Sequence, residues 1–307
     1  MEESDLQFWR SIAVKMTEQV EKAVSPLVGK KEAGEIIKMG ADGTPSKLID
    51  LVAEDEVIEV LIRSKRPVIL ISEEIGTIKI NSSPNDYLDT ESLRNAHDEN
   101  IEPNGDFFKT SPDPQIIFVV DPLDGTSNSV KNIPAFGISV AVAEYIPGAN
   151  LPSLRDVKMG FVKNFATGDF YEAIKGRESL VNGERVFPST QDSLNKSSMG
   201  AFIYGTKFSQ VNNICKIIRR MRILGSVALE LSYVGNGAYD AFMDLRGNLR
   251  VVDIAAAKLI VEEAGGIVTD QEGKSVDGLL SVNARTSIIA AGNSNLHQEI
   301  MKIMEVI

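Results

Sequence analysis

The first part of the chain alternates between helical and strand-like patterns of hydrophobic residues. In residues 6–24, apolar side chains recur three and four positions apart, which predicts an amphipathic helix. Residues 39–50, MGADGTPSKLID, hold two glycines and a proline and are typical of a flexible loop. The pattern after this loop, up to residue 63, is helical again. Short apolar runs that predict buried strands follow at residues 68–72, 116–120 and 137–143.

The second part of the chain alternates strands and helices more regularly, which argues for an α/β layer structure. Strands are predicted at residues 158–163, 169–175, 199–204, 221–224, 239–243 and 286–291. A turn is predicted at residues 181–184, and helices at about 207–220, 226–238, 253–265 and 294–306. The change of pattern near residue 146 predicts two units, an α+β half over residues 1–146 and an α/β half over residues 147–307.

Residues 78–115, between the first two predicted strands, are unusually polar. They number 38, hold four prolines and carry eight acidic against three basic side chains. Loops longer than about 15 residues inside a domain are usually functional or disordered. We therefore expect a partly disordered acidic insertion that Phe107 and Phe108 attach to the surface of the protein.

Composition and charge narrow the possible functions. The 307 residues are 43% hydrophobic and 24% charged, which is ordinary for a globular protein. With 32 basic and 43 acidic residues, the net charge of −11 argues against binding to nucleic acid or to an anionic membrane. No apolar run reaches the roughly 18 residues of a membrane span, and the start of the chain lacks a signal-peptide pattern. We therefore expect a soluble, cytoplasmic protein.

Cysteine and histidine are scarce. The single cysteine, Cys215, excludes an internal disulfide framework and cysteine-rich zinc sites. The two histidines, His97 and His297, lack the neighbours that a Ser–His–Asp mechanism needs. Because the chain has a net charge of −11, we expect it to need metal ions if it binds a phosphorylated ligand.

The most informative motif follows the second predicted strand. Asp121 and Asp124 stand three positions apart, and paired carboxylates at the end of a strand make a hard-oxygen site suited to Mg²⁺. Gly125 lets the backbone approach a ligand, and Thr126 can start a helix whose free N–H groups face an anion. The motif suits a metal-held phosphate. The alternative interpretation is a plain Asp–Gly turn with a helix cap.

Further acidic positions also adjoin apolar segments. Glu73 and Glu74 follow the strand at residues 68–72, Asp253 begins an alanine-rich helix, and Asp50 opens the helix after the flexible loop. Taken singly, the two glutamates are typical of a solvated strand end, and the two aspartates of helix caps. Taken together they predict nearby cations, because buried carboxylates need them.

Three motifs in this order, SEE, DPLDGTSN and VVDIAAAKLIVEEAGG, resemble those of the inositol monophosphatase and fructose-1,6-bisphosphatase superfamily. The resemblance covers about residues 6–300, and it is strongest to archaeal enzymes that act on both inositol phosphates and fructose 1,6-bisphosphate. It extends to GADGTPSKLID as a mobile metal loop and to RILGSVALELSYVGNGAYDAFMDLR before the last acid. It implies a layered αβαβα sandwich and a Mg²⁺-dependent sugar-phosphate phosphatase.

The resemblance implies a set of metal ligands. Glu73 and Asp121, with the backbone carbonyl of Leu123, would hold a first ion. Asp121, Asp124 and Asp253 would hold a second. Glu73 would also help to hold a third, weaker ion, so that two or three Mg²⁺ ions bind, with Mn²⁺ able to substitute.

The resemblance also implies the catalytic and phosphate-binding groups. Asp50 and Thr126 would orient the attacking water, with Glu74 as a helper. The N–H groups of Gly125 and Thr126 would bind the phosphate.

Substrate-binding residues are expected in the C-terminal half. Gly225 and Ser226 match a loop that binds a substrate hydroxyl, and Asp244 and Arg246 occupy the substrate region before the last acid. Further candidates, some of them for a second phosphate, are Tyr204, Lys207, Arg222 and Arg250. The alternative for each arginine is a surface or interface role.

The sequence departs from the family pattern in two places. The segment between SEE and DPLDG is much longer than usual because of the acidic insertion. Val252 stands where many inositol monophosphatases have tryptophan, which alters packing near the substrate.

These residues predict direct hydrolysis of a phosphate monoester by a metal-activated water, without a Ser, Cys or His nucleophile. The expected substrates are fructose 1,6-bisphosphate, cleaved at the 1-phosphate, and inositol 1-phosphate, in a role in gluconeogenesis and carbohydrate metabolism. The expected assembly is a homodimer or homotetramer. The alternatives are a 3′(2′),5′-bisphosphate nucleotidase of the same superfamily, a non-catalytic divalent-cation or phosphate-binding protein, and an interaction protein that uses the acidic insertion.

Overall fold

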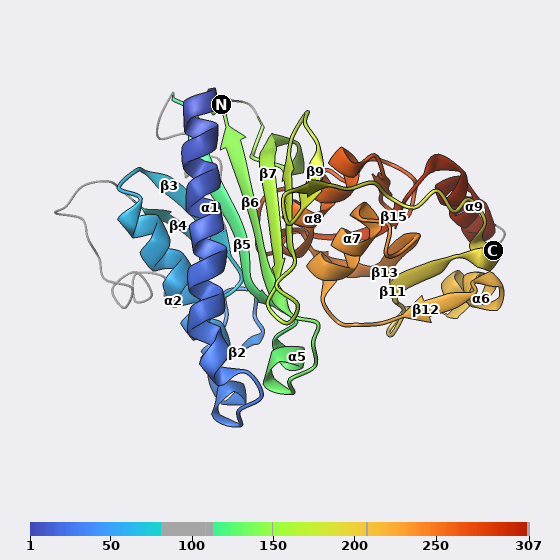
Figure 1. Ribbon diagram of the computed structural model, residues 1–307, viewed down its shortest axis with the longest axis horizontal. Coiled ribbons are helices and arrows are strands. Elements are labelled where there is room, and N and C mark those ends of the chain that lie inside the picture. Colours follow the sequence, from blue (N-terminus) through green and yellow to red (C-terminus); the bar gives the residue numbers. More distant parts are fainter. Residues whose placement is uncertain (81–107, 109–112, 149, 207, 306–307) are drawn as a thin grey trace.

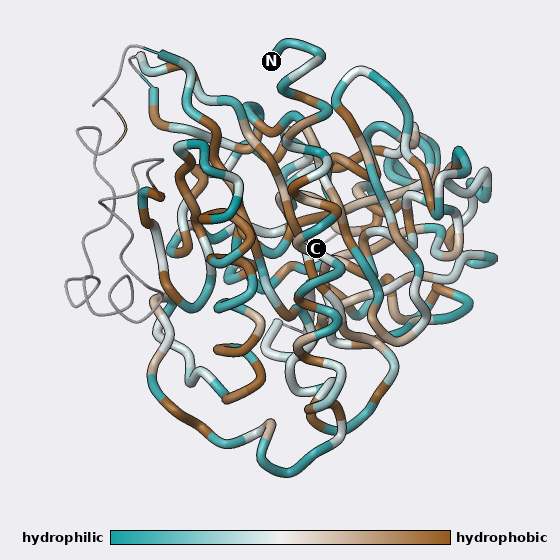
Figure 2. Tube along the Cα trace, turned by 60° about the vertical axis from the view of Figure 1, so that its left-hand side comes forward, coloured by the Kyte–Doolittle hydropathy of each residue, from teal (hydrophilic) through white to brown (hydrophobic). Residues whose placement is uncertain are grey.

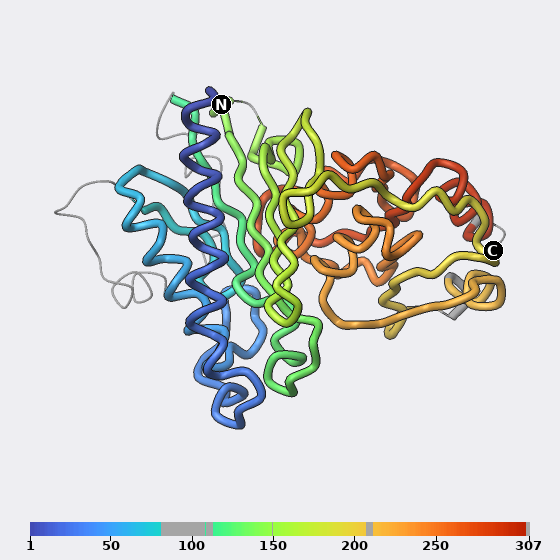
Figure 3. The backbone as a smooth tube through the Cα atoms, viewed as in Figure 1, coloured from blue at the N-terminus to red at the C-terminus, as the bar shows by residue number. Residues whose placement is uncertain are grey.

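Five alternating layers of helices and sheets make up the part of the chain that the computed structural model describes, namely residues 1–80, 108, 113–148, 150–206 and 208–305 (Figure 1). This arrangement confirms the predicted αβαβα sandwich. The N-terminus lies beside the larger sheet, and the C-terminal end lies at the outer face of the smaller one (Figure 3).

Two long helices, α1 (Glu3–Val24) and α2 (Leu48–Arg63), form the first layer and cover one face of the larger sheet. The predicted helical spacing in α1 is confirmed, because all the residues at that spacing except the half-buried Ile12 are buried. They include Leu6, Trp9, Ala13, Met16 and Val20. Two short 3-10 turns, η1 (Ser25–Leu27) and η2 (Glu32–Gly34), follow α1.

The larger sheet has eight strands in the order β10-β9-β8-β7-β6-β5-β3-β4. Its strands are β3 (Val68–Ser72), β4 (Gly76–Ile80), β5 (Gln115–Asp124), β6 (Gly137–Tyr145), β7 (Val157–Asn164), β8 (Phe170–Ile174), β9 (Ser179–Val181) and β10 (Glu184–Arg185). Strands β3 and β5 are parallel, and the other neighbours are antiparallel. The sheet crosses the predicted boundary near residue 146, because β6 and β7 pair with each other. The change of sheet falls after β10 instead.

Helices α7 (Val227–Gly235) and α8 (Val251–Ala264) form the middle layer, between the two sheets. The smaller sheet has five strands in the order β12-β11-β13-β15-β14. These strands are β11 (Ser198–Phe202), β12 (Arg220–Arg222), β13 (Ala241–Arg250), β14 (Ile267–Thr269) and β15 (Arg285–Ala291). Helices α6 (Phe208–Ile217) and α9 (Ser294–Glu305) cover its outer face. The described residues also form the short elements α5 (Thr126–Val130), η4 (Leu154–Asp156) and η5 (Leu194–Lys196).

Three hydrophobic cores fill the spaces between these layers. Hydrophobic segments run along the central strands and the helices that face them, whereas many outer turns are hydrophilic (Figure 2). Burial of each large apolar side chain stabilises the fold by about 1.5–3 kcal/mol. No helix in the described ranges is both long and apolar enough to cross a membrane.

The predicted loop at residues 39–50 is partly a hairpin. Strands β1 (Ile36–Met39) and β2 (Pro45–Lys47) pair in antiparallel fashion, and the Gly40 N–H donates to the Thr44 carbonyl at 2.8 Å. Gly43 has a φ of +84°, which glycine adopts without strain. The glycines that suggested a flexible loop therefore form the turn of this hairpin.

Other expectations also need correction. The strand predicted at residues 239–243 continues as β13 to Arg250, and strand β14 was not predicted. Residues 78–80 belong to strand β4 rather than to the insertion. Phe108 is buried, with its ring 5.7 Å from that of Tyr145, so it attaches to the core. The predicted disorder, and Phe107, fall on residues 81–107 and 109–112, which lie outside the described residues.

Candidate active site

Three carboxylates converge where β3, β5 and α8 meet. Ser72 and Val120 are partners in the parallel register of β3 and β5, so the residues that follow them, Glu73 and Asp121, emerge at one edge of the sheet. Asp253 reaches the same place from the first turn of α8. One carboxylate oxygen from each of the three residues lies within 4.8 Å of the others. We call Glu73, Asp121 and Asp253 the acid cluster.

Burial opposes ionisation of the acid cluster. Asp121 is 1% exposed, and burial, together with the charges of Glu73 and Asp124, raises its pKa well above the usual range. Burial also raises the pKa of Glu73 to about 8, although Arg250 acts in the opposite direction. Carboxylates in such a place stay charged only when cations accompany them. An all-oxygen donor set of this kind fits a hard divalent cation such as Mg²⁺.

The guanidinium of Arg250 lies among these acids. Its Nε donates to both oxygens of Asp253 at 3.0 Å, and its Nη1 donates to Asp42 at 2.6 Å and to Glu73. Sequence analysis named Arg250 as a candidate for a second phosphate site, with a surface or interface role as the alternative. The structure places it in the acid cluster instead, because Arg250 ends β13 immediately before α8 presents Asp253.

Asp124 is fixed by the start of α7. Its Oδ2 accepts hydrogen bonds from the Ser226 hydroxyl at 2.6 Å and from the Ala228 N–H at 2.7 Å. Burial raises the pKa of Asp124 to about 6, and the Ser226 hydrogen bond limits the rise. The predicted ligand Asp124 and the predicted substrate loop at Gly225 and Ser226 are therefore in direct contact.

Asp50 and Thr126 are also brought together. Asp50 lies in the first turn of α2, where its Oδ2 accepts the Lys47 N–H at 2.9 Å. Its Oδ1 is buried and accepts no hydrogen bond of normal geometry from a described residue. Burial raises the pKa of Asp50, and the Lys47 N–H and the nearby Thr126 hydroxyl limit the rise. Thr126 itself donates to the Leu123 carbonyl at 3.1 Å.

Glu74 connects the site to the β1–β2 hairpin. Its side chain accepts a hydrogen bond from the Ser46 hydroxyl, and its carbonyl accepts the Ala41 N–H at 3.2 Å. Burial raises the pKa of Glu74 to about 7. To a smaller extent, the Ser46 hydrogen bond lowers this pKa and the negative charge of Asp50 raises it. Glu74 therefore supports the hairpin, whereas Glu73 faces the acid cluster.

The predicted substrate-binding residues near the smaller sheet form groups that are separate from the acid cluster. Arg246 pairs with the buried Asp244 at 2.6 Å and stacks on the rings of Phe202 and Tyr204, 4.9 and 4.5 Å from their centroids. The guanidinium of Arg222 lies 5.5 Å from the ring centroid of Tyr239. Lys207 lies outside the described residues.

Glu230 is a supporting residue that sequence analysis missed. Its Oε1 accepts hydrogen bonds from the N–H groups of Leu224 and Gly225 at 2.9 and 3.1 Å, and these bonds fix the predicted substrate loop. Asn128 holds the same loop by donating to the Leu224 carbonyl at 2.8 Å. The signal for Glu230 was an acid inside the otherwise apolar helix pattern VALELSYVG. Sequence analysis also gave no role to Asp42, and the signal for it was an Asp–Gly turn within the predicted metal loop.

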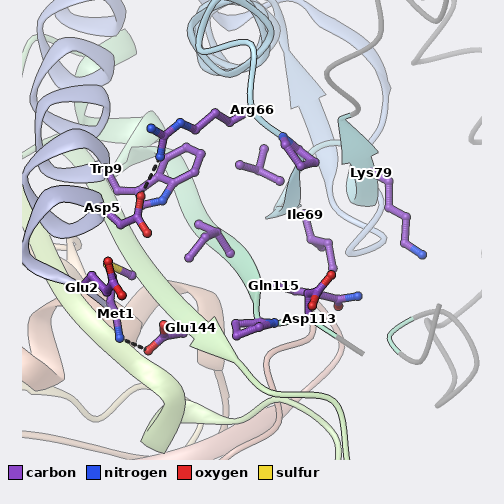
Figure 4. A pocket seen from close by; sticks show the side chains of 14 residues that line it. Met1, Glu2, Asp5, Trp9, Arg66, Ile69, Lys79, Asp113, Gln115 and Glu144 are labelled. Carbon is purple, nitrogen blue, oxygen red and sulfur yellow. Dashed lines mark hydrogen bonds and ion pairs between the residues drawn. The ribbon is translucent and has the colours of Figure 1, made fainter. Parts of the chain in front are cut away.

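A cavity of about 790 Å³ lies at the other end of the larger sheet (Figure 4). Its lining includes Trp9, Arg66 and the starting residues of β3 and β5, Val68 and Gln115. The acids follow the carboxyl ends of these two parallel strands, so the cavity is separate from the acid cluster.

An αβαβα sandwich that gathers buried acids beside an oriented Asp–Thr pair defines a candidate metal-dependent hydrolase. The model of the inositol monophosphatase family matches residues 2–307. A fructose-1,6-bisphosphatase/inositol-1-monophosphatase of Methanothermobacter thermautotrophicus is 61% identical, with both chains covered in full. A bifunctional NADP phosphatase/NAD kinase of Methanococcus maripaludis is 37% identical over 95% of this chain, which spans 48% of that protein.

The solved structures agree with these matches. A Pyrococcus horikoshii protein with similarities to inositol-1 monophosphatase has 31% identity and a TM-score of 0.73, over 96% of this chain and 98% of the other. The chain therefore belongs to the inositol monophosphatase family of phosphoric monoester hydrolases.

Proposed function

We propose that this protein is a Mg²⁺-dependent phosphatase that hydrolyses fructose 1,6-bisphosphate at the 1-phosphate and also hydrolyses inositol 1-phosphate. The observation that carries the proposal is the convergence of the acid cluster to within 4.8 Å. The name of the relative that is 61% identical over the full chain supports this pair of substrates.

The acid cluster, Asp124 and the Leu123 carbonyl are the groups that would hold the ions. When bound, the ions supply an activated water and neutralise the charge of the phosphate and of the leaving oxygen. The surrounding residues hold the proposed ligands in position. Ser226 and Ala228 fix Asp124 by hydrogen bonds, and the sheet register places Glu73 beside Asp121.

Asp50 and Thr126 would orient the attacking water. The buried Oδ1 of Asp50 is available to accept a hydrogen bond from the attacking water, while its Oδ2 accepts a hydrogen bond from the Lys47 N–H. The Thr126 hydroxyl stays in place because it donates to the Leu123 carbonyl. Fixing a water in line with the ester bond accelerates hydrolysis by positioning, without a covalent intermediate.

The substrate would lie between α5 and α7. The first N–H groups of a helix lack partners within the helix, so Gly125 and Thr126, at the start of α5, suit a phosphate. A Cβ at Gly125 would lie 2.6 Å from the Ala135 carbonyl, so the sharp turn into α5 requires glycine. The loop at Gly225 and Ser226 would contact a sugar hydroxyl.

A second candidate is a nucleotide phosphatase that acts on NADP⁺ or on adenosine bisphosphates. The 37% identity to a bifunctional NADP phosphatase/NAD kinase favours it. The ring of Tyr204 is 57% exposed and stacked on Arg246, so it could accept a nucleobase.

Phosphate release with Mg²⁺ from fructose 1,6-bisphosphate, inositol 1-phosphate, NADP⁺ and adenosine 3′,5′-bisphosphate separates the candidates. We expect the two sugar phosphates to give the highest kcat/KM. A higher kcat/KM for either nucleotide would replace the proposed substrates with the second candidate.

A further inference from the structure

We propose that Arg250 is a positioning residue that acts as a built-in cation of the acid cluster. Its guanidinium holds Glu73 and Asp253 together and competes with the metal ion for their oxygens. This inference rests on the proposed metal site, and it assigns to this arginine a role in setting the metal affinity of the protein.

The contacts of Arg250 join three elements. It is the last residue of β13, its Nε spans both oxygens of Asp253 in α8, and its Nη1 reaches Glu73 after β3. The same Nη1 donates to Asp42 in the β1–β2 hairpin at 2.6 Å. The Arg250 side chain is 20% exposed. Hydrogen bonds between a guanidinium and a carboxylate are among the strong hydrogen bonds in proteins.

Arg250 contacts carboxylates that a metal ion would need, and its Nε spans both oxygens of Asp253. Glu73 and Asp253 supply two of the three converging carboxylates, and Arg250 donates to both. A guanidinium and a divalent cation that share these oxygens would lie only a few ångströms apart and repel each other strongly in a poorly solvated site. Binding of the ion is therefore expected to weaken the contact between Arg250 and these carboxylates.

Arg250 also balances part of the negative charge of the acid cluster. Without a cation, Glu73, Asp121 and Asp253 would face one another in a buried place, and each raises the cost of ionising its neighbours. Arg250 supplies one positive charge at that point. Asp42 can keep the guanidinium nearby when Glu73 and Asp253 are taken by an ion, because its other oxygen, Oδ1, is held by Thr44 at 2.8 Å.

Arg246 offers a matched control. It lies four positions before Arg250 on the same strand and also pairs with a buried aspartate, but that partner is Asp244, outside the acid cluster. Replacing Arg246 removes a comparable ion pair and leaves the acid cluster intact.

The experiment measures Mg²⁺ and Mn²⁺ binding by calorimetry, and thermal unfolding in EDTA, for the wild type, Arg250→Gln, Arg250→Lys and Arg246→Gln. We expect Arg250→Gln to bind Mg²⁺ about tenfold more tightly, because a charge-assisted hydrogen bond no longer has to be broken. We expect its Tm in EDTA to fall by about 5 °C or more, because the buried acids lose their counter-ion.

Arg250→Lys keeps the charge but loses the planar fork, so we expect a metal affinity between those of the wild type and Arg250→Gln. It keeps the test decisive if Arg250→Gln does not fold. Arg246→Gln should bind Mg²⁺ like the wild type. An Arg250 variant that folds and binds Mg²⁺ no more tightly than the wild type overturns the inference.

Asp121→Asn separates this inference from the proposed function. If the wild type binds Mg²⁺ and Asp121→Asn does not, the metal site stands, and the Arg250 variants decide the inference alone. If the wild type binds no Mg²⁺, the proposed metal site fails and the inference fails with it.

Discussion

At the scale of single residues, the buried acids of this protein differ in the partners that compensate their charge. Asp124 accepts two hydrogen bonds from Ser226 and the start of α7, and Asp244 is paired with Arg246. Asp121 accepts one hydrogen bond, from the Leu123 N–H at 3.1 Å, among the contacts of the described chain, and it faces other acids. Of these three aspartates, Asp121 is therefore the one whose charge depends most on an added cation.

Asp121→Asn tests this dependence. We expect kcat to fall by more than about 100-fold. Mutation of residues that only hold a metal ligand in place already lowers metal affinity or activity by roughly 10–100-fold, and Asp121 is a proposed ligand itself. Stability in EDTA should hold or rise, since one charge of a mutually repelling cluster is removed. Activity assays in saturating Mg²⁺ and urea unfolding in EDTA provide the two measurements. Near-wild-type turnover would exclude Asp121 as a ligand.

Glu230 gives a prediction about pH. Burial raises the pKa of Glu230 to about 8, so the folded protein holds a proton there that the unfolded chain has released. The stability from this proton is present in acid and is lost as the pH rises toward 8. In Glu230→Gln this loss is absent, so its stability relative to the wild type should rise by up to about 1.4 kcal/mol per pH unit between pH 5 and 8.

Urea unfolding in EDTA at several pH values measures this difference, with Glu32→Gln, at an exposed position on η2, as the control. Parallel stability curves for the wild type and Glu230→Gln would show that Glu230 is ionised throughout this range.

The candidate metal ligands could be predicted from sequence because each of them is a local feature, an acid at the end of a strand or at the start of a helix. The position of Arg250 could not. Arg246 and Arg250 look alike in the segment DLRGNLR, and only the register of β13 and the start of α8 decide which arginine meets Glu73. The Asp42 contact likewise joins residues 208 positions apart.

At the scale of elements, the β1–β2 hairpin joins the rest of the site through a small number of hydrogen bonds and one ion pair. It contacts the site through Ser46 and Ala41, which bind Glu74, through Asp42, which binds Arg250, and through the Lys47 N–H, which binds Asp50. A segment held by so few contacts opens easily unless bound groups hold it.

We therefore expect backbone amide exchange in residues 40–44 to slow when Mg²⁺ and phosphate are added together. Hydrogen exchange with mass spectrometry can follow this segment. The β9–β10 turn at residues 182–183, at the opposite edge of the larger sheet, serves as the internal control and should not change. Equal exchange of residues 40–44 with and without the ligands would argue that the hairpin does not close over the site.

Most elements could be predicted from hydrophobic periodicity, and the exceptions have physical reasons. Strand β13 looked too short because its pairing with β15 is irregular between Asp244 and Leu249, where Gly247 has a φ of +70°. Strand β14 has three residues and pairs at the edge of its sheet, so its pattern is too brief to recognise. The hairpin was missed because its turn residues dominate a short segment.

At the scale of the whole molecule, the site is built at the junction of the two sheets. The larger sheet supplies Glu73 and Asp121, the middle layer supplies Asp253 and fixes Asp124, and β13 of the smaller sheet ends at Arg250, which contacts Asp253. The predicted division at residue 146 misplaced this junction, because nothing in the local pattern shows that β7–β10 extend the first sheet.

Arg246→Ala tests whether the smaller sheet recognises the part of the substrate away from the reacting phosphate. We expect KM for fructose 1,6-bisphosphate to rise by about tenfold, because a charge-assisted contact to the second phosphate is lost. KM for inositol 1-phosphate, which has no second phosphate, should change far less. Equal increases for both substrates would mean that Arg246 supports the fold through Asp244 rather than binding phosphate.

The most direct test of the central claim, that the buried acids form a metal-dependent phosphate-ester hydrolase, follows fructose 1,6-bisphosphate by phosphorus NMR with the wild-type protein, first in EDTA and then in Mg²⁺. We predict no turnover in EDTA and, in Mg²⁺, loss of the 1-phosphate signal with retention of the 6-phosphate signal. Hydrolysis at an equal rate in EDTA, or an unchanged substrate in Mg²⁺, would contradict the account.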